Sequence, residues 1–200
     1  MIKLDTFRYA LSSYSKFLWR STNAHGIHSP FVYDLVTKCF YDQKKYPQYA
    51  ILQTIRKELG RSNHIIQVLD FGAGSRAPGL QKSQTRRVKK MLSSAATSAK
   101  RQRLFMRLVQ YFEPENILEL GTHLGMGTLA IKLGIPEAEI TSVEGCQNTF
   151  EFTKNNIERW LSKTMPADKP LKSGQIKLVN SSFAEYFEKR SKDRDAQQKI

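Results

Sequence analysis

Beyond residue 115 the apolar residues alternate between the spacing of strands and the spacing of helices, and this alternation constrains the fold most. Short apolar runs indicate strands, and apolar residues three or four positions apart indicate helices. The expected strands span 116–120, 139–144 and 175–180, and the expected helices span 127–133, 150–161 and a segment that begins at 183. Strands that alternate with helices pair in parallel through right-handed crossovers, so we predict an α/β fold with a parallel sheet.

The first of these strands runs directly into a glycine-rich turn. Ile117–Leu120 has the composition of a buried strand, and Gly121, Gly125 and Gly127 follow it. Glycine lets the backbone approach a ligand closely and adopt turn angles that other residues resist. The backbone N–H groups at the start of the next helix can then hold the carboxylate of a ligand. The segment 119–128 is therefore the candidate cofactor loop.

The next strand supplies a partner for this loop. It ends in Glu144, nineteen residues after Gly125. A carboxylate at that position can accept hydrogen bonds from both hydroxyls of a ribose. The loop, the helix after it and the strand that ends in Glu144 together predict a nucleotide-type cofactor site.

A second glycine-rich segment, Asp70–Ser75, also follows an expected strand, at 65–71. A nucleotide-binding unit needs a helix directly after the loop and then a second strand that ends in a carboxylate. Here Pro78 and Gly79 force a turn, and the next acidic residue is Glu113. We therefore exclude Asp70–Ser75 as the cofactor loop.

The first sixty residues are predicted to be largely helical. One apolar stripe repeats at intervals of three and four residues and consists of Leu4, Phe7, Leu11, Tyr14 and Leu18. A stripe of this kind marks the buried side of an amphipathic helix. We expect the helix to dock on the core of the chain, and a helix that lies on a membrane surface is the less favoured alternative.

A turn at 25–31 is expected to end that helix. Gly26 permits unusual backbone angles, and Pro30 can open the next helix with Ser29 as its cap. His25 and His28 lie three residues apart, but no carboxylate or thiol lies beside them to complete a metal site. We therefore favour a structural turn and predict no metal.

Positive charge is concentrated in one segment. The chain has a net charge of +14, and between Phe71 and Phe112 it carries ten Lys or Arg residues and no acidic residue. Such a block can attract nucleic acid or an anionic substrate. A solvated surface is favoured, because 76–99 has no aromatic residue on which a base could stack. We expect 76–99 to form a mobile loop with one short helix, and the helical pattern to resume at 100.

The motif Glu-Leu-Gly-Thr-x-x-Gly-x-x-Thr at 119–128 resembles the first motif of class I S-adenosylmethionine-dependent methyltransferases, especially the small-molecule O-methyltransferases. Val143–Cys146 is similar to the second motif of that family, whose acidic residue binds ribose. Leu178–Ala184 is similar to the segment that borders the adenine. The resemblance covers roughly 100–190 and implies S-adenosylmethionine as the cofactor and a small molecule as the methyl acceptor.

The resemblance also implies roles for single residues, although it gives no catalytic residue. The methionine end of the cofactor would be lined by Glu119, Gly121, Thr122 and Gly125, the ribose would be held by Glu144 with Gly145 and Cys146 beside it, and the adenine would lie near Ser182 and Phe183. The alternatives are plain core packing for Phe183 and a solvent-facing strand end for Glu144.

The family has a seven-stranded sheet in the order 3-2-1-4-5-7-6, and the resemblance assigns strands 3, 2 and 1 to this chain. We therefore expect a partial Rossmann-like methyltransferase sheet (strands 3-2-1) with an N-terminal helical extension. Residues 1–99 would form the extension with its basic loop, and 100–200 the cofactor-binding half of the domain. The strand with Ile117, Leu118 and Leu120 would be an open edge. We expect a fragment, a prematurely stopped product, or pairing of this edge with a second copy.

The leading functional prediction is S-adenosylmethionine-dependent methyl transfer, impaired in this chain because the acceptor half is missing. The alternatives are a non-catalytic basic nucleic-acid-binding protein and an NAD-type Rossmann oxidoreductase. Dinucleotide enzymes favour Gly-x-Gly-x-x-Gly, whereas this loop has Gly-x-x-x-Gly-x-Gly. No apolar run is long enough to span a membrane, and two cysteines are too few for a disulfide framework. We therefore expect a cytoplasmic protein without a membrane partner.

Overall fold

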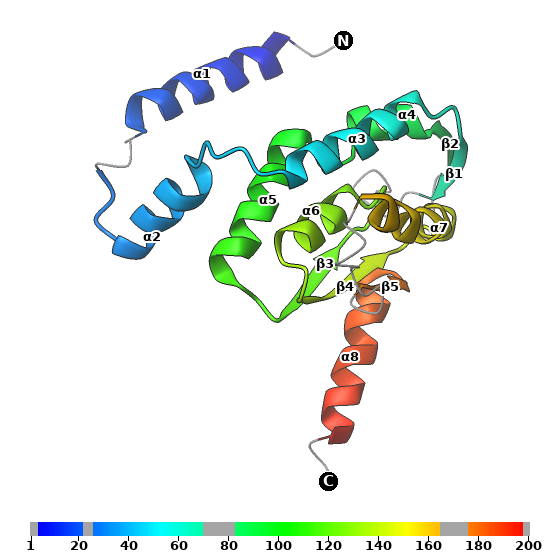
Figure 1. Ribbon diagram of the computed structural model, residues 1–200. Helices are drawn as coiled ribbons and strands as arrows, with labels where there is room; N and C mark the ends of the chain where they lie inside the picture. Colours follow the sequence, from blue (N-terminus) through cyan, green and yellow to red (C-terminus); the bar gives the residue numbers. More distant parts are fainter. Residues whose placement is uncertain (1–3, 22–25, 70–82, 165–175, 198–200) are drawn as a thin grey trace. The chain divides into compact units, whose positions relative to one another are not determined.

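The computed structural model describes residues 4–21, 26–69, 83–164 and 176–197 of the 200-residue chain (Figure 1). The chain divides into two compact units, residues 1–43 and 44–200. No helix among the described residues is long and apolar enough to cross a membrane.

The first unit consists of helices. Helix α1 spans Leu4–Arg20, helix α2 spans Pro30–Leu35, and a π-helical turn, η2, continues it over Val36–Phe40. The predicted helix start is confirmed: Pro30 is the first residue of α2, and Ser29 caps it by accepting a hydrogen bond from the backbone of Val32. His25 lies outside the described residues.

The apolar stripe of α1 is not covered within its own unit. Phe7, Leu11, Tyr14 and Leu18 all expose more than half of their surface. The docking of this helix on the core of the chain therefore stays a prediction.

The second unit begins with helix α3 (Gln48–Arg61) and a hairpin of two antiparallel strands, β1 (Ile65–Leu69) and β2 (Ser83–Arg87). Helix α4 (Val88–Ser94) follows directly. The one short helix expected in this segment is present as α4, whereas the loop expected over 83–87 is wrong, because these residues form β2. Backbone pairing with β1 holds β2, and buried apolar side chains hold α4. The glycine-rich segment Asp70–Ser75 lies outside the described residues.

Helix α5 (Ala99–Phe112) begins and ends where the sequence predicts. Ser98 caps its first turn by accepting a hydrogen bond from the backbone of Arg101. Glu113 ends it in the left-handed region, with φ of 45°. A Ser cap satisfies one of the free N–H groups of the first turn, and the left-handed residue turns the chain out of the helix.

The remainder of the unit is the alternating strand and helix pattern that the sequence predicts. Its elements are β3 (Asn116–Leu120), α6 (Met126–Gly134), β4 (Glu139–Glu144), α7 (Gln147–Thr164), β5 (Ile176–Asn180) and α8 (Phe183–Gln197). The three strands pair in parallel in the order β3-β4-β5. The family strands 1, 2 and 3 correspond to β3, β4 and β5. The predicted partial Rossmann-like sheet, with the family strand order 3-2-1, is therefore confirmed.

The two faces of this sheet differ. Ser142 pairs in register with Glu119 on the face that packs against α6 and the apolar core. On the opposite face Leu118 and Leu120 are 37% and 45% exposed. Among the described residues β3 pairs only with β4, so the predicted open edge is present. Its pairing with a second copy stays a prediction.

One apolar core joins the early helices of the second unit to the later ones. It combines Leu52 of α3, Met91 of α4, Leu129 of α6 and Trp160 of α7, all of them buried. This shared core explains why the compact units divide after residue 43, whereas the sequence analysis places the division after 99. Residues 44–99 are part of the unit that carries the parallel sheet.

Candidate functional site

The loop between β3 and α6 has an unusual backbone. Gly121, His123 and Gly125 have φ values of +98°, +49° and +71°, all in the left-handed region. Glycine adopts such angles without strain, whereas a side chain clashes with its own backbone. A Cβ atom on Gly125 would also lie 2.9 Å from Cγ2 of Thr153. Glycine at 121 and 125 therefore fits the prediction of a tight turn at this loop.

Backbone hydrogen bonds fix the start of the loop to the neighbouring strand. The N–H groups of Gly121 and Thr122 both donate to the carbonyl oxygen of Val143, at 2.8 and 3.2 Å. The hydroxyl of Thr122 lies 2.6 Å from that of Ser142. The loop thus continues the pairing of β3 with β4 beyond the last residue of the strand.

The carboxylate of Glu144 joins the end of β4 to the middle of the loop. Its Oε2 accepts a hydrogen bond from the N–H of His123 at 2.8 Å, and its Oε1 accepts one from the N–H of Cys146 at 2.9 Å. The glycine loop and the predicted ribose-binding carboxylate therefore lie side by side. Glu144 is half-buried and bound to the loop, unlike an isolated solvent-facing strand end.

Glu119 lies beneath the loop, on the face of the sheet that α6 covers. Its Oε2 accepts hydrogen bonds from the hydroxyls of Thr128 and Ser142, at 2.5 and 2.6 Å. Burial raises the pKa of Glu119, the two hydroxyl donors oppose that rise, and the negative charge of Glu144 adds to it. A Cβ atom on Gly127 would collide with Oε1 of Glu119. The Glu119 carboxylate therefore packs against the first turn of α6.

His123 is a residue of this site that sequence reasoning missed. Its N–H donates to Glu144, and its carbonyl oxygen accepts a hydrogen bond from the hydroxyl of Thr153 at 2.5 Å. Burial lowers the pKa of the His123 imidazole, and the positive charge of Arg86 lowers it further. No described group is a hydrogen-bond partner of its buried Nδ1.

The end of β5 completes the rim of the site. The side-chain amide of Asn180 donates to the carbonyl oxygen of Glu144 at 2.8 Å and approaches that of Gly145 at 3.5 Å. The ring of Phe183 lies 4.0 Å from the position that a Cβ on Gly121 would take. Phe183 is 45% exposed, so it lies at the rim and not in the core.

Ser182 has a structural role at the start of α8. Its hydroxyl accepts a hydrogen bond from the N–H of Glu185 at 3.3 Å, and its own N–H donates to the Glu185 carboxylate at 3.1 Å. This reciprocal arrangement is a capping box. The hydrogen bonds from Ser182 lower the pKa of Glu185. Ser182 therefore lies at the predicted edge with its side chain engaged in capping the helix.

The β1–β2 hairpin also reaches this edge of the sheet. The N–H of Leu69, the last residue of β1, donates to Sγ of Cys146 at 3.3 Å. The side-chain amide of Asn148 donates to the carbonyl oxygen of Gln67 at 2.8 Å. The hairpin thus lies beside the residues that follow β4.

The first turn of α6 is buried and has no side-chain cap. Its cap residue is Gly125, which has no side chain to accept a hydrogen bond from the N–H groups of that turn. Uncapped N–H groups and the positive end of the helix dipole favour a bound anion. Among the described residues no group of three His, Cys, Asp or Glu side chains could hold a metal ion.

The structure thus brings together the predicted residues from all three strand ends: Glu119, Gly121, Thr122, Gly125, Glu144, Gly145, Ser182 and Phe183. It adds Thr128, Ser142 and Thr153, which were not predicted. Ser142 could have been found, because a serine inside an apolar strand needs a buried polar partner. Thr128 is the last residue of the quoted motif, although no role was assigned to it, and Thr153 carries no comparable signal.

No protein-family model matches the chain, and no curated protein sequence matches it. Its fold is similar to the solved structure of an SAH-bound methyltransferase from Podospora anserina, with 14% identity, a TM-score of 0.44, and coverage of 80% of this chain and 52% of that one. It is also similar to an O-methyltransferase from Bacillus cereus in complex with SAH, with 14% identity, a TM-score of 0.43, and coverage of 79% and 57%. The chain therefore spans about half the length of these two structures.

Proposed function

We propose that the chain binds S-adenosylmethionine at the carboxyl edge of the β3-β4-β5 sheet and serves methyl transfer to a small molecule. One observation carries the proposal: the Glu144 carboxylate is hydrogen-bonded to the N–H of His123, inside the glycine loop. In open α/β sheets, ligands bind in the crevice outside the carboxyl ends of the strands. Here a glycine turn, an uncapped helix start and a carboxylate all lie at that edge.

The residues fit the cofactor in shape and in hydrogen-bonding capacity. Each oxygen of the Glu144 carboxylate accepts one backbone N–H, and a carboxylate oxygen can accept two hydrogen bonds. Two acceptor positions therefore stay available for the hydroxyls of a ribose. Apart from its two chain neighbours, the described atom within 4 Å of a would-be Cβ on Gly121 belongs to the Phe183 ring. That space would admit the chain between the ribose and the amino-acid end.

When bound, S-adenosylmethionine supplies an electrophilic methyl group on a sulfonium. The role of this chain is to hold and orient it. The uncapped first turn of α6 would hold the amino-acid carboxylate. Glu144 would fix the ribose, and the exposed ring of Phe183 offers an apolar surface to the adenine. Methyl transfer depends chiefly on such alignment of the donor with the acceptor.

Calorimetric titration of the full chain with S-adenosylhomocysteine tests the proposal. We expect saturable binding by the wild type and at least a tenfold loss of affinity, about 1.4 kcal/mol, in Glu144→Gln. Glu139→Gln is the matched control, because Glu139 lies at the opposite end of the same strand. It should bind within twofold of the wild type.

The same titration separates the alternatives that the sequence left open. Saturable binding of NADH without binding of S-adenosylhomocysteine would favour the oxidoreductase and overturn the proposal. Heat with neither ligand, from a chain whose circular dichroism matches the α/β content, would overturn the cofactor site altogether.

A further inference from the structure

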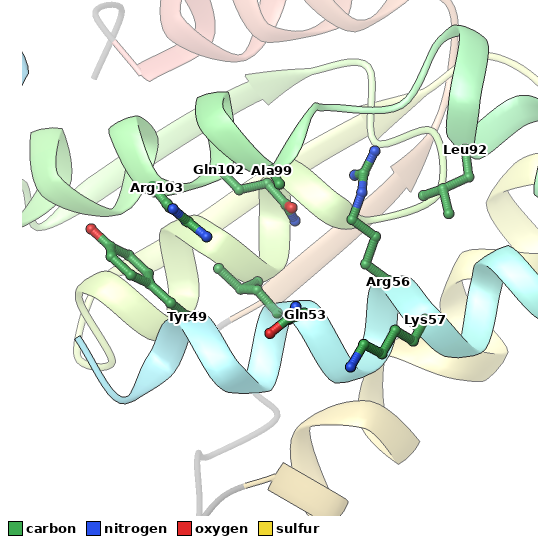
Figure 2. A pocket seen from close by; sticks show the side chains of 9 residues that line it. Tyr49, Gln53, Arg56, Lys57, Leu92, Ala99, Gln102 and Arg103 are labelled. Carbon is green, nitrogen blue, oxygen red and sulfur yellow. The ribbon is translucent and has the colours of Figure 1, made fainter. Parts of the chain in front are cut away.

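A pocket of about 380 Å³ lies in the second unit, between α3 and α5, and none of its lining residues belongs to the glycine loop (Figure 2). In Figure 2 Tyr49 and Arg103 lie at one end of the pocket, and Leu92 of α4 lies at the other. Its volume is within the range of pockets that hold small organic molecules, roughly 300–1,000 Å³.

Three cationic side chains line the pocket. Arg56 and Lys57 come from α3, and Arg103 comes from α5. No acidic side chain is among the described residues of the lining. In Figure 2 the charged ends of these three side chains point in different directions, so each offers a separate donor to an anion at the pocket.

Two of these cations are held in place. Nη1 of Arg56 donates to the carbonyl oxygen of Thr97 at 2.8 Å. The guanidinium of Arg103 lies over the ring of Tyr49, 5.2 Å from its centre. An arginine that is already oriented loses less conformational freedom when it binds a ligand, and its planar donors match a carboxylate.

The remaining lining is largely apolar. Leu52 and Leu92 are buried, and their side chains and Ala99 form apolar surface beside the Tyr49 ring. A simple inorganic anion would leave this surface in contact with water. An anion that carries an apolar body would cover it, at a gain of about 25 cal/mol for each Å².

Gln102 connects the pocket to the core of the unit. It is 1% exposed, and its side-chain amide donates to the carbonyl oxygen of Met126, the first residue of α6, at 2.9 Å. The pocket wall is therefore a packed and hydrogen-bonded surface between three helices, which favours a preformed binding site.

We propose that this pocket binds a small amphipathic organic anion, with its carboxylate bound to a lining cation and a ring-sized apolar body against Leu52, Leu92 and Ala99. This site is separate from the proposed cofactor site, because its lining residues come from α3, α4 and α5 and none from the three parallel strands. Nucleic acid is the less favoured occupant, since phosphates would engage the cations and leave the apolar lining exposed.

The probe is 1-naphthoate, and 1-naphthylmethylammonium is the matched cation of nearly the same size. We expect the full chain to bind naphthoate and to bind the cation at least tenfold more weakly. Heteronuclear NMR should show naphthoate shifting the side-chain amide of Gln102. Equal affinity for both probes, or no shift of Gln102, would overturn the proposal.

Two kinds of variant locate the site. Lys57→Gln combined with Arg103→Gln should weaken naphthoate binding at least fivefold, and Lys189→Gln on α8 should leave it within twofold. Ala99→Phe leaves every charge unchanged but fills the apolar end, and it should abolish binding. Unchanged affinity in both the double variant and Ala99→Phe would refute the site.

Two further experiments distinguish this pocket from the proposed cofactor site and from a nucleic-acid site. Glu144→Gln should bind naphthoate as the wild type does, because it alters only the cofactor edge. Loss of naphthoate binding in that variant would place the probe at the cofactor site and overturn the proposal. Saturable, salt-sensitive binding of a single-stranded oligonucleotide that the Lys57→Gln and Arg103→Gln double variant weakens, with no binding of naphthoate, would assign the pocket to nucleic acid and overturn the proposal.

Discussion

Two glutamates near the carboxyl ends of neighbouring strands have opposite surroundings. Glu119 of β3 lies beneath the glycine loop, where two hydroxyls bind its carboxylate and α6 covers it. Glu144 of β4 lies at the rim, where two backbone N–H groups bind its carboxylate. Both side chains are half-buried, but the first carboxylate is held by side-chain hydroxyls and the second by backbone N–H groups.

This difference predicts different roles for the two residues: Glu119 stabilises the structure of the site, and Glu144 contacts the ligand. A buried carboxylate with two hydroxyl donors fixes the residues around it, because an unpaired polar atom in that place costs about 1–3 kcal/mol. A rim carboxylate bound by backbone N–H groups keeps its position and still offers hydrogen-bond capacity. We therefore expect changes around Glu119 to alter stability first, and changes at Glu144 to alter affinity first.

Gly127→Ala should have the largest effect on stability. Its Cβ would collide with Oε1 of Glu119, and the other oxygen of that carboxylate, Oε2, is held by the hydroxyls of Thr128 and Ser142. Overpacking of this kind costs about 1–3 kcal/mol, so we expect a loss of about 2 kcal/mol in the free energy of unfolding by urea.

Gly60→Ala is the control for that substitution. Gly60 lies in α3, where a Cβ would make only an ordinary contact, at 3.7 Å from Leu92. Alanine favours the helix over glycine, so this variant should gain about 0.5–1 kcal/mol. If Gly127→Ala were as stable as the wild type, the close packing of α6 on Glu119 would be wrong.

Glu119→Gln should have an intermediate effect that tests the comparison directly. Glutamine keeps the volume and an acceptor oxygen, and it removes the cost of burying a charge. We expect S-adenosylhomocysteine to bind this variant less than threefold more weakly than the wild type, against at least tenfold for Glu144→Gln. Equal losses in the two variants would mean that Glu119 contacts the cofactor itself, as the family resemblance implies.

The sequence predicted the parallel sheet because its strands are apolar runs between helical repeats. It also located the loop and Glu144, since the spacing of a strand, a glycine turn and the next strand end is set by the fold. It missed β2, whose residues Ser83–Arg87 are polar and are held by backbone pairing with β1. Backbone pairing leaves no pattern in side chains, so apolar periodicity could not reveal this strand.

The contacts within the site likewise could not be predicted from the sequence. The role of Glu144 followed from its place at a strand end, but its binding of the His123 N–H depends on the path of the loop backbone. The hydroxyls of Thr128 and Ser142 converge on Glu119 from α6 and β4, a meeting that only the folded chain defines. Residues 44–99 were placed outside the domain because their apolar residues meet the core only through long-range packing.

The smallest expected effect is a change in the pH dependence of stability, and it arises at His123. Burial and the charge of Arg86 lower the pKa of this imidazole in the folded chain, below the ordinary value of about 6.5 that it regains on unfolding. Between the folded and unfolded pKa values of His123, the unfolded chain binds more protons than the folded chain. The contribution of His123 to stability is therefore fully present above about pH 6.5 and is lost as the pH falls below that value.

His123→Asn should flatten that fall, because asparagine does not titrate and tolerates the left-handed φ of this position. Urea unfolding of the variant and of the wild type at pH 7.5 and pH 5.5 measures the difference. Burial raises the pKa of Glu119 and so acts in the opposite sense, destabilising the fold as the pH rises above about 4.3, the ordinary value of a glutamate. A wild-type slope in His123→Asn would show that the imidazole of His123 does not carry the pH dependence.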